Sequence, residues 1–195
     1  MSDQPAGRGA YFDTLYDGNI DPWQYHSCDY EIAKRADTLA LLPREHYARG
    51  CEIGCSIGVL TAELAPRCDA LIGIDIAEAA AAAARIAVAA FPQVEIRVMH
   101  VPHALPGGSF DLLMLSEVLY FLTAAELADL AAFAGRQVVA GGDVMIVSYD
   151  GETLTTLNGR ASTDVFAAAA APWFDTVDET ARPEYHVRRL RRRDG

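Results

Sequence analysis

Basic residues are scarce in this chain of 195 residues. It carries 16 Lys and Arg against 27 Asp and Glu, which gives a formal net charge of -11. The one basic cluster, at 188–193, is expected to be a solvated last strand and tail. Binding to nucleic acid depends on a basic face that meets the phosphates. The charge balance therefore argues against a nucleic-acid partner and mildly favours a cationic small molecule.

Cysteine is also scarce, and its spacing does not match a metal site. No Cys-x-x-Cys pair and no His-x-x-x-His partner occurs that would complete a zinc site. We therefore expect no metal, and reduced thiols as in a cytoplasmic protein. The cysteines are Cys28, Cys51, Cys55 and Cys68.

Long apolar runs are absent as well. The longest, from about Ala79 to Ala90, is rich in alanine and is interrupted by Arg85, so it is too weakly hydrophobic to cross a membrane. The first residues have no apolar core and do not read as a signal peptide. These features predict a cytoplasmic protein without a membrane partner.

Hydrophobic residues are plentiful, at 51% of the chain, and 22% of the residues are charged. This composition supports a sizeable core, and the length suits about one domain. No repeat or long linker divides the chain. We expect an N-terminal helical lid segment at 1–45 and a core at 46–195, within one domain overall.

Strand-like and helix-like segments alternate along the core. Consecutive apolar residues, as at 70–75 and 110–117, suit parallel strands that are covered on both faces. Five such strands imply a doubly wound α/β sheet with helices on both faces, and a short connection near Arg182 adds a C-terminal antiparallel hairpin. We expect seven strands, at 51–54, 70–75, 94–101, 110–117, 143–150, 173–180 and 184–192.

Helices are expected between these strands. Pro43 and Pro66 end two of them, and Thr123 with Glu126 has the spacing of a capping box. The glycine pair 141–142 is expected to break the helix that follows Thr123. The expected helices span 29–42, 58–65, 77–90, 124–140 and 163–171.

The first strand-to-helix loop is the main candidate for ligand binding, because ligands of open parallel sheets lie beyond the carboxyl ends of the strands. Gly54 and Gly58 in this loop let the backbone turn tightly and approach a ligand. A dinucleotide fingerprint would need glycine at 56 and 59, where the chain has Ser56 and Val59. A P-loop lysine is absent too, so a pyrophosphate is poorly supported.

Asp75 ends the second expected strand, 21 residues beyond Gly54. A carboxylate at that place can accept hydrogen bonds from both hydroxyls of a ribose. It can also cap the helix that follows. Taken together, the glycine loop, Asp75 and the terminal hairpin describe a nucleoside ligand without a pyrophosphate. S-adenosylmethionine (SAM) fits that description.

At this point the sequence resembles a class I SAM-dependent methyltransferase, which has a Rossmann-like fold. The loop EIGCSIG resembles the E-x-G-x-G-x-G motif of that family, with Ser56 in place of the middle glycine. Together with AYFDTLYDGNIDPWQY and SEVLYFL, it looks most like the nodulation protein S group. Members of that group are N-methyltransferases that act on the free amine of a deacetylated chitin oligosaccharide. The resemblance covers about residues 10–190.

The resemblance implies a role for each matching residue. The loop would line the methionine part of SAM, Asp75 would hold the ribose, and Ile76 would pack on the adenine. His100 and Val101 follow the third strand near the adenine amino group, where the family commonly has an acidic residue in place of His100. The expected cofactor-binding residues are Trp23, Glu52, Gly54, Cys55, Ser56, Gly58, Asp75, Ile76, His100, Val101 and Ser116.

The N-terminal segment would form a lid over the cofactor and the acceptor, with Tyr11, Tyr16, Trp23 and Tyr25. Aromatic faces attract a sulfonium, so Tyr11 and Trp23 are candidates to stabilise it. Lys34 or Arg35 could pair with the carboxylate of SAM, or could simply be solvated.

Glu117 and Tyr120 are the candidate catalytic residues. An amine must be neutral to attack the methyl group, so a carboxylate at the end of the fourth strand could bind it or act as its base. Tyr120, three residues on, would face the same cleft. His100 and His103 are secondary candidates.

The function indicated by these features is transfer of a methyl group from SAM to a small-molecule amine, such as an amino sugar, with S-adenosyl-L-homocysteine as product. The donor carries its own electrophile, so the protein aligns the two reactants and manages one proton. Three alternatives stay open: an O-methyltransferase, an NAD-dependent oxidoreductase, and a non-catalytic protein with a degenerate SAM fold. The chain is expected to be a monomer or a homodimer.

Overall fold

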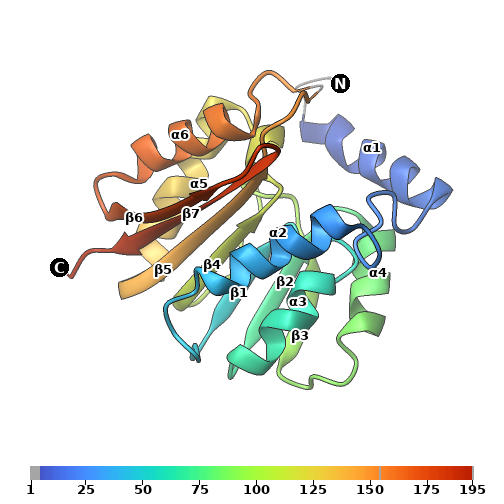
Figure 1. Ribbon diagram of the computed structural model, residues 1–195, viewed down its shortest axis with the longest axis horizontal. Helices are drawn as coiled ribbons and strands as arrows, with labels where there is room; N and C mark the ends of the chain where they lie inside the picture. The colour runs from blue at the N-terminus through green and yellow to red at the C-terminus, as the bar shows by residue number, and fades with distance from the viewer. Residues whose placement is uncertain (1–4, 154, 195) are drawn as a thin grey trace.

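The computed structural model describes residues 5–153 and 155–194, which form one seven-stranded sheet (Figure 1). The spatial order of the strands is β3-β2-β1-β4-β5-β7-β6. The first five strands are parallel, and β7 runs antiparallel to both β5 and β6. This confirms the predicted sheet and its terminal hairpin. The strands are β1 (Gly50–Ile53), β2 (Leu71–Asp75), β3 (Val94–Val98), β4 (Phe110–Ser116), β5 (Val138–Tyr149), β6 (Phe174–Ala181) and β7 (Tyr185–Arg192).

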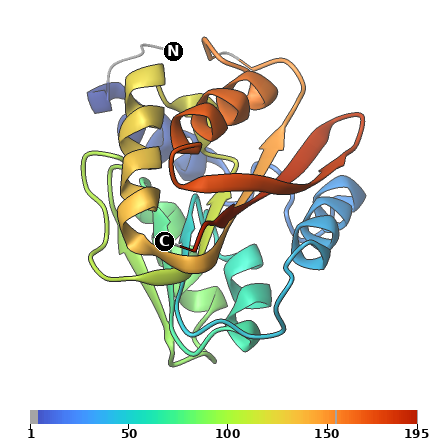
Figure 2. The same ribbon diagram turned by 90° about the vertical axis from the view of Figure 1, so that its left-hand side faces the viewer.

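Helices cover both faces of the sheet, as predicted (Figures 1 and 2). Helices α5 and α6 pack on one face, and α2, α3 and α4 lie on the other. Helix α1 packs beside α4. The helices are α1 (Pro5–Gly18), α2 (Asp29–Ala40), α3 (Val59–Leu64), α4 (Glu78–Ala87), α5 (Ala124–Gln137) and α6 (Gly159–Ala170). The structure does not test a boundary near residue 45, which stays a prediction.

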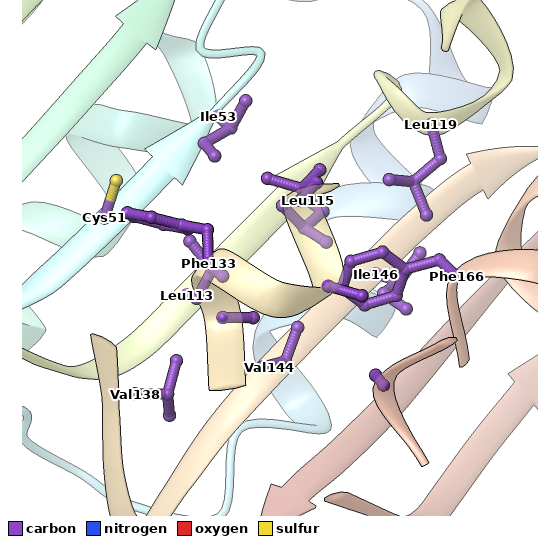
Figure 3. Close-up of a cluster of buried hydrophobic side chains, with 14 of the residues drawn as sticks. Cys51, Ile53, Leu113, Leu115, Leu119, Phe133, Val138, Val144, Ile146 and Phe166 are labelled. Carbon is purple, nitrogen blue, oxygen red and sulfur yellow. The ribbon is translucent and has the colours of Figure 1, made fainter. Parts of the chain in front are cut away.

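Alternating residues of β4 enter two different cores. Leu113 and Leu115 point to the face covered by α5 and α6, where Phe133 and Phe166 pack (Figure 3). Residues 112 and 114 join the core on the opposite face. Because side chains alternate across a strand, a strand buried on both faces needs an unbroken apolar run.

The boundary between α5 and β5 differs from the prediction. The helix ends at Gln137 and the strand begins at Val138, ahead of the glycine pair that was expected to break the helix. Two β-branched valines at 138 and 139 favour the strand. Gly141 has a φ of +69°, and the pairing of β5 with β4 shifts register beside it. The glycines therefore form an irregularity inside a strand.

Two further boundaries differ. Helix α6 begins at Gly159, four residues earlier than expected, because the Asn158 side chain caps it by accepting a hydrogen bond from the Ala161 N–H at 2.8 Å. Strand β3 ends at Val98 and not at 101. The capping box of Thr123 and Glu126 is confirmed, with both reciprocal hydrogen bonds present.

Candidate active site

A cavity of about 330 Å³ lies at the carboxyl ends of β1, β2 and β4. The chain leaves β1 towards β2 and β3, then returns to the other side of β1 as β4, so the strand order reverses there. Open α/β sheets bind ligands at such a switch point. The volume lies in the range of small-molecule sites. A second cavity, of about 30 Å³, has room for one or two water-sized groups and shares part of the lining.

Gly54 shapes the loop after β1. Its φ is +86°, and a Cβ there would collide with the backbone oxygen of Ser116. Ser56, in the same loop, and Glu117, after β4, are non-glycine residues with positive φ, at 46° and 53°. Strained backbone of this kind concentrates at functional sites. The ends of β1 and β4 therefore approach each other more closely than any side chain at position 54 would allow.

We expect Gly54→Ala to destabilise the fold by at least about 3 kcal/mol. The substitution forces alanine into a left-handed conformation and drives its methyl group into a backbone atom that cannot give way. Urea unfolding measures the change. The matched control is Gly107→Ala, where a Cβ would meet nothing within 4 Å and the expected change is within about 0.5 kcal/mol. Equal stability of the two variants would contradict the argument.

Asp75 organises the loops after both β1 and β2. One carboxylate oxygen accepts from the Ser56 N–H and the other from the Ala77 N–H, each at 2.9 Å. The residue is 9% exposed and lines the large cavity. Burial raises the pKa of Asp75, although the backbone hydrogen bonds partly oppose the shift. A carboxylate has about four lone-pair positions, so Asp75 keeps acceptor capacity for a ligand beyond its capping role.

Glu52 lines the smaller cavity and is fully buried. Thr61 Oγ1 donates to its Oε2 at 2.6 Å, while Oε1 has no partner among the described residues. Burial raises the pKa of Glu52 to about 8. A buried carboxylate oxygen without a donor is costly, so this atom suits a cationic or donor group of a ligand.

Lys34, the only lysine in the chain, links two carboxylates across the cavities. Its Nζ donates to Glu31 Oε1 at 2.9 Å and to Glu117 Oε1 at 2.6 Å. Burial alone would lower the pKa of Lys34, but these ion pairs outweigh it and raise the pKa. Glu117 Oε2 also accepts from the Tyr120 hydroxyl at 3.0 Å and from the Tyr149 N–H at 2.8 Å. Both Glu117 oxygens are therefore engaged.

Aromatic side chains form much of the remaining wall. Trp23 packs against Tyr16 and Tyr25, with ring centroids 5.7 Å apart in each pair. Tyr30 stands edge-on to Tyr149 at 6.4 Å, and Lys34 Nζ lies 4.8 Å from the centroid of the Tyr30 ring. Aromatic faces beside carboxylates make a site that favours cations.

Helix α1 is fastened over the cavity from two sides. Arg8 donates from one nitrogen to both carboxylate oxygens of Glu126 at 3.0 Å, and both side chains are buried. The hydroxyls of Tyr16 and Ser56 are hydrogen-bonded at 2.6 Å. Burial alone would raise the pKa of Glu126, but hydrogen bonds from Thr123 and Arg8 outweigh it and lower the pKa. The helix is thus anchored to α5 and to the β1 loop.

The structure brings most of the predicted site residues together. The large cavity is lined by Trp23, Gly54, Ser56, Asp75, Ile76, Val101, Ser116, Glu117 and Tyr120. The smaller one is lined by Glu52 and Cys55, and shares Gly54, Ser56, Ser116 and Glu117. Of the lid aromatics, Tyr16, Trp23 and Tyr25 also face the large cavity. The individual roles of these residues stay predictions.

Two residues predicted to bind the cofactor, His100 and Gly58, lie outside both cavities, and their roles stay predictions. His100 is exposed and faces Gly9 of α1, while its neighbours Met99 and Val101 line the large cavity. Gly58 is the N-cap of α3, and a Cβ there would lie 2.8 Å from the Cα of Ala84, so this glycine lets α3 approach α4.

The remaining candidates are Tyr11, His103 and Arg35, whose roles stay predictions. The exposed Tyr11 ring packs on Phe12, 5.2 Å between centroids. His103 Nε2 lies 3.3 Å from Glu126 Oε1. Arg35 lines the smaller cavity, and it donates to Glu63 at 3.0 Å and to the Tyr25 carbonyl at 2.7 Å. Neither Tyr11 nor His103 lines the large cavity.

Several lining residues were not anticipated. They come mainly from α1, α2 and the ends of strands. Tyr149 could have been found from the sequence, because it is an aromatic residue that ends β5, shortly after the apolar run of that strand. They include Arg8, Phe12, Tyr30, Glu31, Met99, Phe121 and Tyr149. Within residues 5–153 and 155–194, no group of three or more His, Cys, Asp or Glu side chains is placed to hold a metal ion. In the same part of the chain, no helix has the length and hydrophobicity to cross a membrane.

Comparison with known proteins assigns the family. The sequence profile of nodulation protein S (NodS) matches residues 16–149, more than half of the chain. The chain belongs to the nodulation protein S family. A NodS protein of Rhizobium tropici is 30% identical over 132 residues, which cover 66% of this chain and 55% of that protein. The present NodS-family chain spans about half the length of the curated relatives that it matches.

Solved structures share the fold of this NodS-family chain. A candidate methyltransferase from Pseudomonas syringae is 32% identical and has a TM-score of 0.74, over 84% of this chain and 99% of that one. The N-methyltransferase NodS of Bradyrhizobium japonicum WM9, in complex with S-adenosyl-L-homocysteine, has a TM-score of 0.79 at 19% identity, over 93% of this chain and 98% of that one. This NodS-family chain therefore shares the methyltransferase fold.

Proposed function

We propose that this chain is a SAM-dependent N-methyltransferase whose acceptor is a small amine, most specifically an amine of an amino sugar. The observation that carries the proposal is that a single cavity contains both a nucleoside-type site and an acidic, aromatic site for an amine. Near Gly54 and Asp75 it has the features of a nucleoside site, and beside them lie Glu31 and Glu117 among aromatic rings. Family membership and the NodS complex support the same activity.

The residues present fit the methyl donor. The unpartnered Oε1 of Glu52 offers an acceptor for the donor's ammonium group, and the small cavity beside it has room for such a group. Asp75 has spare acceptor capacity for ribose hydroxyls. Ile76 and Val101 supply apolar walls for the adenine. When bound, SAM supplies a methyl group on a sulfonium that an amine can displace in line.

The chain's own residues do the rest. Helix α1 and the following segment would act as a lid that limits the access of water, because Tyr16, Trp23 and Tyr25 line the cavity. The aromatic rings favour the sulfonium and the ammonium over water. The carboxylates set an acidic environment that attracts an amine and rejects an anionic acceptor. An alcohol acceptor gains less from this charge, which favours N- over O-methylation.

A labelled transfer assay tests the proposal. Purified protein is incubated with methyl-labelled SAM and, separately, with glucosamine, the glucosamine disaccharide, ethanolamine and N-acetylglucosamine. We expect label in the first two amines and none in N-acetylglucosamine, whose nitrogen is acylated. Protein-bound label is counted separately, because the buried Lys34 is itself an amine. Transfer to no amine would contradict the proposal.

A further inference from the structure

The buried face of α2 is polar. The buried residues of this helix are Glu31, Lys34 and Thr38, spaced three and four apart on one face. A helix that packs on a sheet ordinarily buries an apolar stripe. The buried charges therefore call for an explanation beyond packing.

Glu31 keeps one oxygen without a partner. Its Oε1 accepts from Lys34, whereas its Oε2 has no hydrogen-bond partner among the described residues, although the residue is only 5% exposed. Glu117 differs, because each of its oxygens already accepts from Lys34, Tyr120 or Tyr149. The free acceptor in this cluster thus belongs to α2 and not to the end of β4.

Glu31 lines both cavities. The large one contains Asp75, at the expected nucleoside end, and the small one contains Glu52, at the expected amino-acid end. The sulfur of SAM joins those two parts of the molecule. A residue that borders both cavities would therefore lie near the methyl group. Lys34 and Glu117 border both as well, but of the three only Glu31 has an oxygen without a hydrogen-bond partner among the described residues.

The surroundings of Glu31 favour a proton acceptor. The charged and titratable groups that face it are Lys34 and Arg35 on its own helix, Glu117 after β4, and Tyr25 and Tyr30. Burial raises the pKa of Glu31, and the Lys34 ion pair opposes that shift only in part. The carboxylate is therefore a better base than an exposed glutamate.

We infer that Glu31 is the catalytic residue that binds the acceptor's ammonium group through Oε2 and takes its proton, with Glu117 and Lys34 as positioning residues. The inference rests on the proposed function. The ammonium gives one proton to Glu31, and the freed nitrogen lone pair forms the N–C bond. The C–S bond breaks, and its electron pair stays on sulfur. Glu31 then passes the proton to water, so charge and atoms balance.

We expect Glu31→Gln to lower kcat/KM at pH 7 by about 10²- to 10³-fold, and the deficit to shrink below about 10-fold near pH 10, where solution deprotonates the amine. The acid limb of the wild-type profile should lie above the ordinary range of a glutamate, because activity needs the Glu31 carboxylate ionised and its pKa is raised. Labelled transfer to the glucosamine disaccharide, measured across pH, provides the data.

Three controls keep the test interpretable. Calorimetry should show SAM affinity of Glu31→Gln within about threefold of wild type, because Gln can still accept from Lys34. Glu31→Asp should recover part of the activity at pH 7, and Asp29→Asn, an exposed change on the same helix, should match wild type. A loss equal at every pH, or no loss in an active protein, would overturn the role of Glu31 alone. A wild type inactive on this amine would overturn the amino-sugar proposal as well.

Discussion

Asp75→Ala is expected to weaken SAM binding by at least about 100-fold. In the proposed complex the carboxylate accepts from two ribose hydroxyls, and hydrogen bonds to a charged group each contribute about 1.5–3 kcal/mol. A loss of about 3 kcal/mol corresponds to more than 100-fold in Kd. The same change leaves the Ser56 N–H and Ala77 N–H without their acceptor, so the loop after β1 loses its anchor too. Calorimetry with SAM measures the effect.

Two further variants separate ligand binding from folding. Asp75→Asn keeps one acceptor oxygen and should give an intermediate loss of affinity. Asp129→Ala removes an exposed carboxylate on α5 and should bind SAM like the wild type. Circular dichroism and thermal unfolding report whether Asp75→Ala remains folded. A folded Asp75→Ala protein with unchanged affinity would remove the ribose role of this residue.

Glu117→Gln is expected to lower turnover by about 100-fold while SAM affinity stays within about threefold, an effect typical of a lost proton-handling or orienting group. The amide cannot pair with Lys34 as the carboxylate does, and its NH2 group cannot accept from Tyr120 or Tyr149. Lys34 still donates to Glu31 but loses its charged anchor at Glu117, so the pair is held less firmly. Since Glu117 acts through Lys34 and Glu31, its deficit should also shrink near pH 10, as it does for Glu31→Gln.

Steady-state kinetics of amine methylation, with calorimetry for SAM, check this prediction. Glu45→Gln, an exposed change of the same type, serves as the matched control and should leave both quantities unaltered. Turnover of Glu117→Gln equal to that of the wild type would show that the Glu117 carboxylate does not position Lys34 and Glu31. A parallel fall in SAM affinity would place Glu117 in the donor site.

The fold was largely predictable, because a strand that is buried on both faces has a continuous run of apolar residues in the sequence. The apolar run of β4 and the short connection near Arg182 determine the parallel sheet and its antiparallel end. The α5–β5 junction was not predictable in this way. The alanine and glycine residues around Val138 are compatible with a helix end or with a strand. The pairing of Val138 with Phe110 of β4 determines that the strand begins there.

The site was predictable only in part. Spacing within one loop and one strand end was enough to single out Gly54 and Asp75. Lys34 was a candidate from the sequence, but its buried pairing with Glu31 and Glu117 was not foreseeable, because charged residues on a helix ordinarily face solvent and Glu117 lies 83 residues away in sequence. The Arg8–Glu126 ion pair joins residues 118 apart. Such contacts come from tertiary packing, which local patterns do not encode.

Calorimetric titration of the purified chain with SAM tests the central claim, that the hollow at the ends of β1, β2 and β4 binds a sulfur-linked nucleoside. S-adenosyl-L-homocysteine and NAD are titrated in parallel. The account predicts one site per chain with a Kd of the order of micromolar for both SAM and its product, and no heat of binding for NAD. Binding of NAD with SAM inert, or no binding of any of the three, would contradict it.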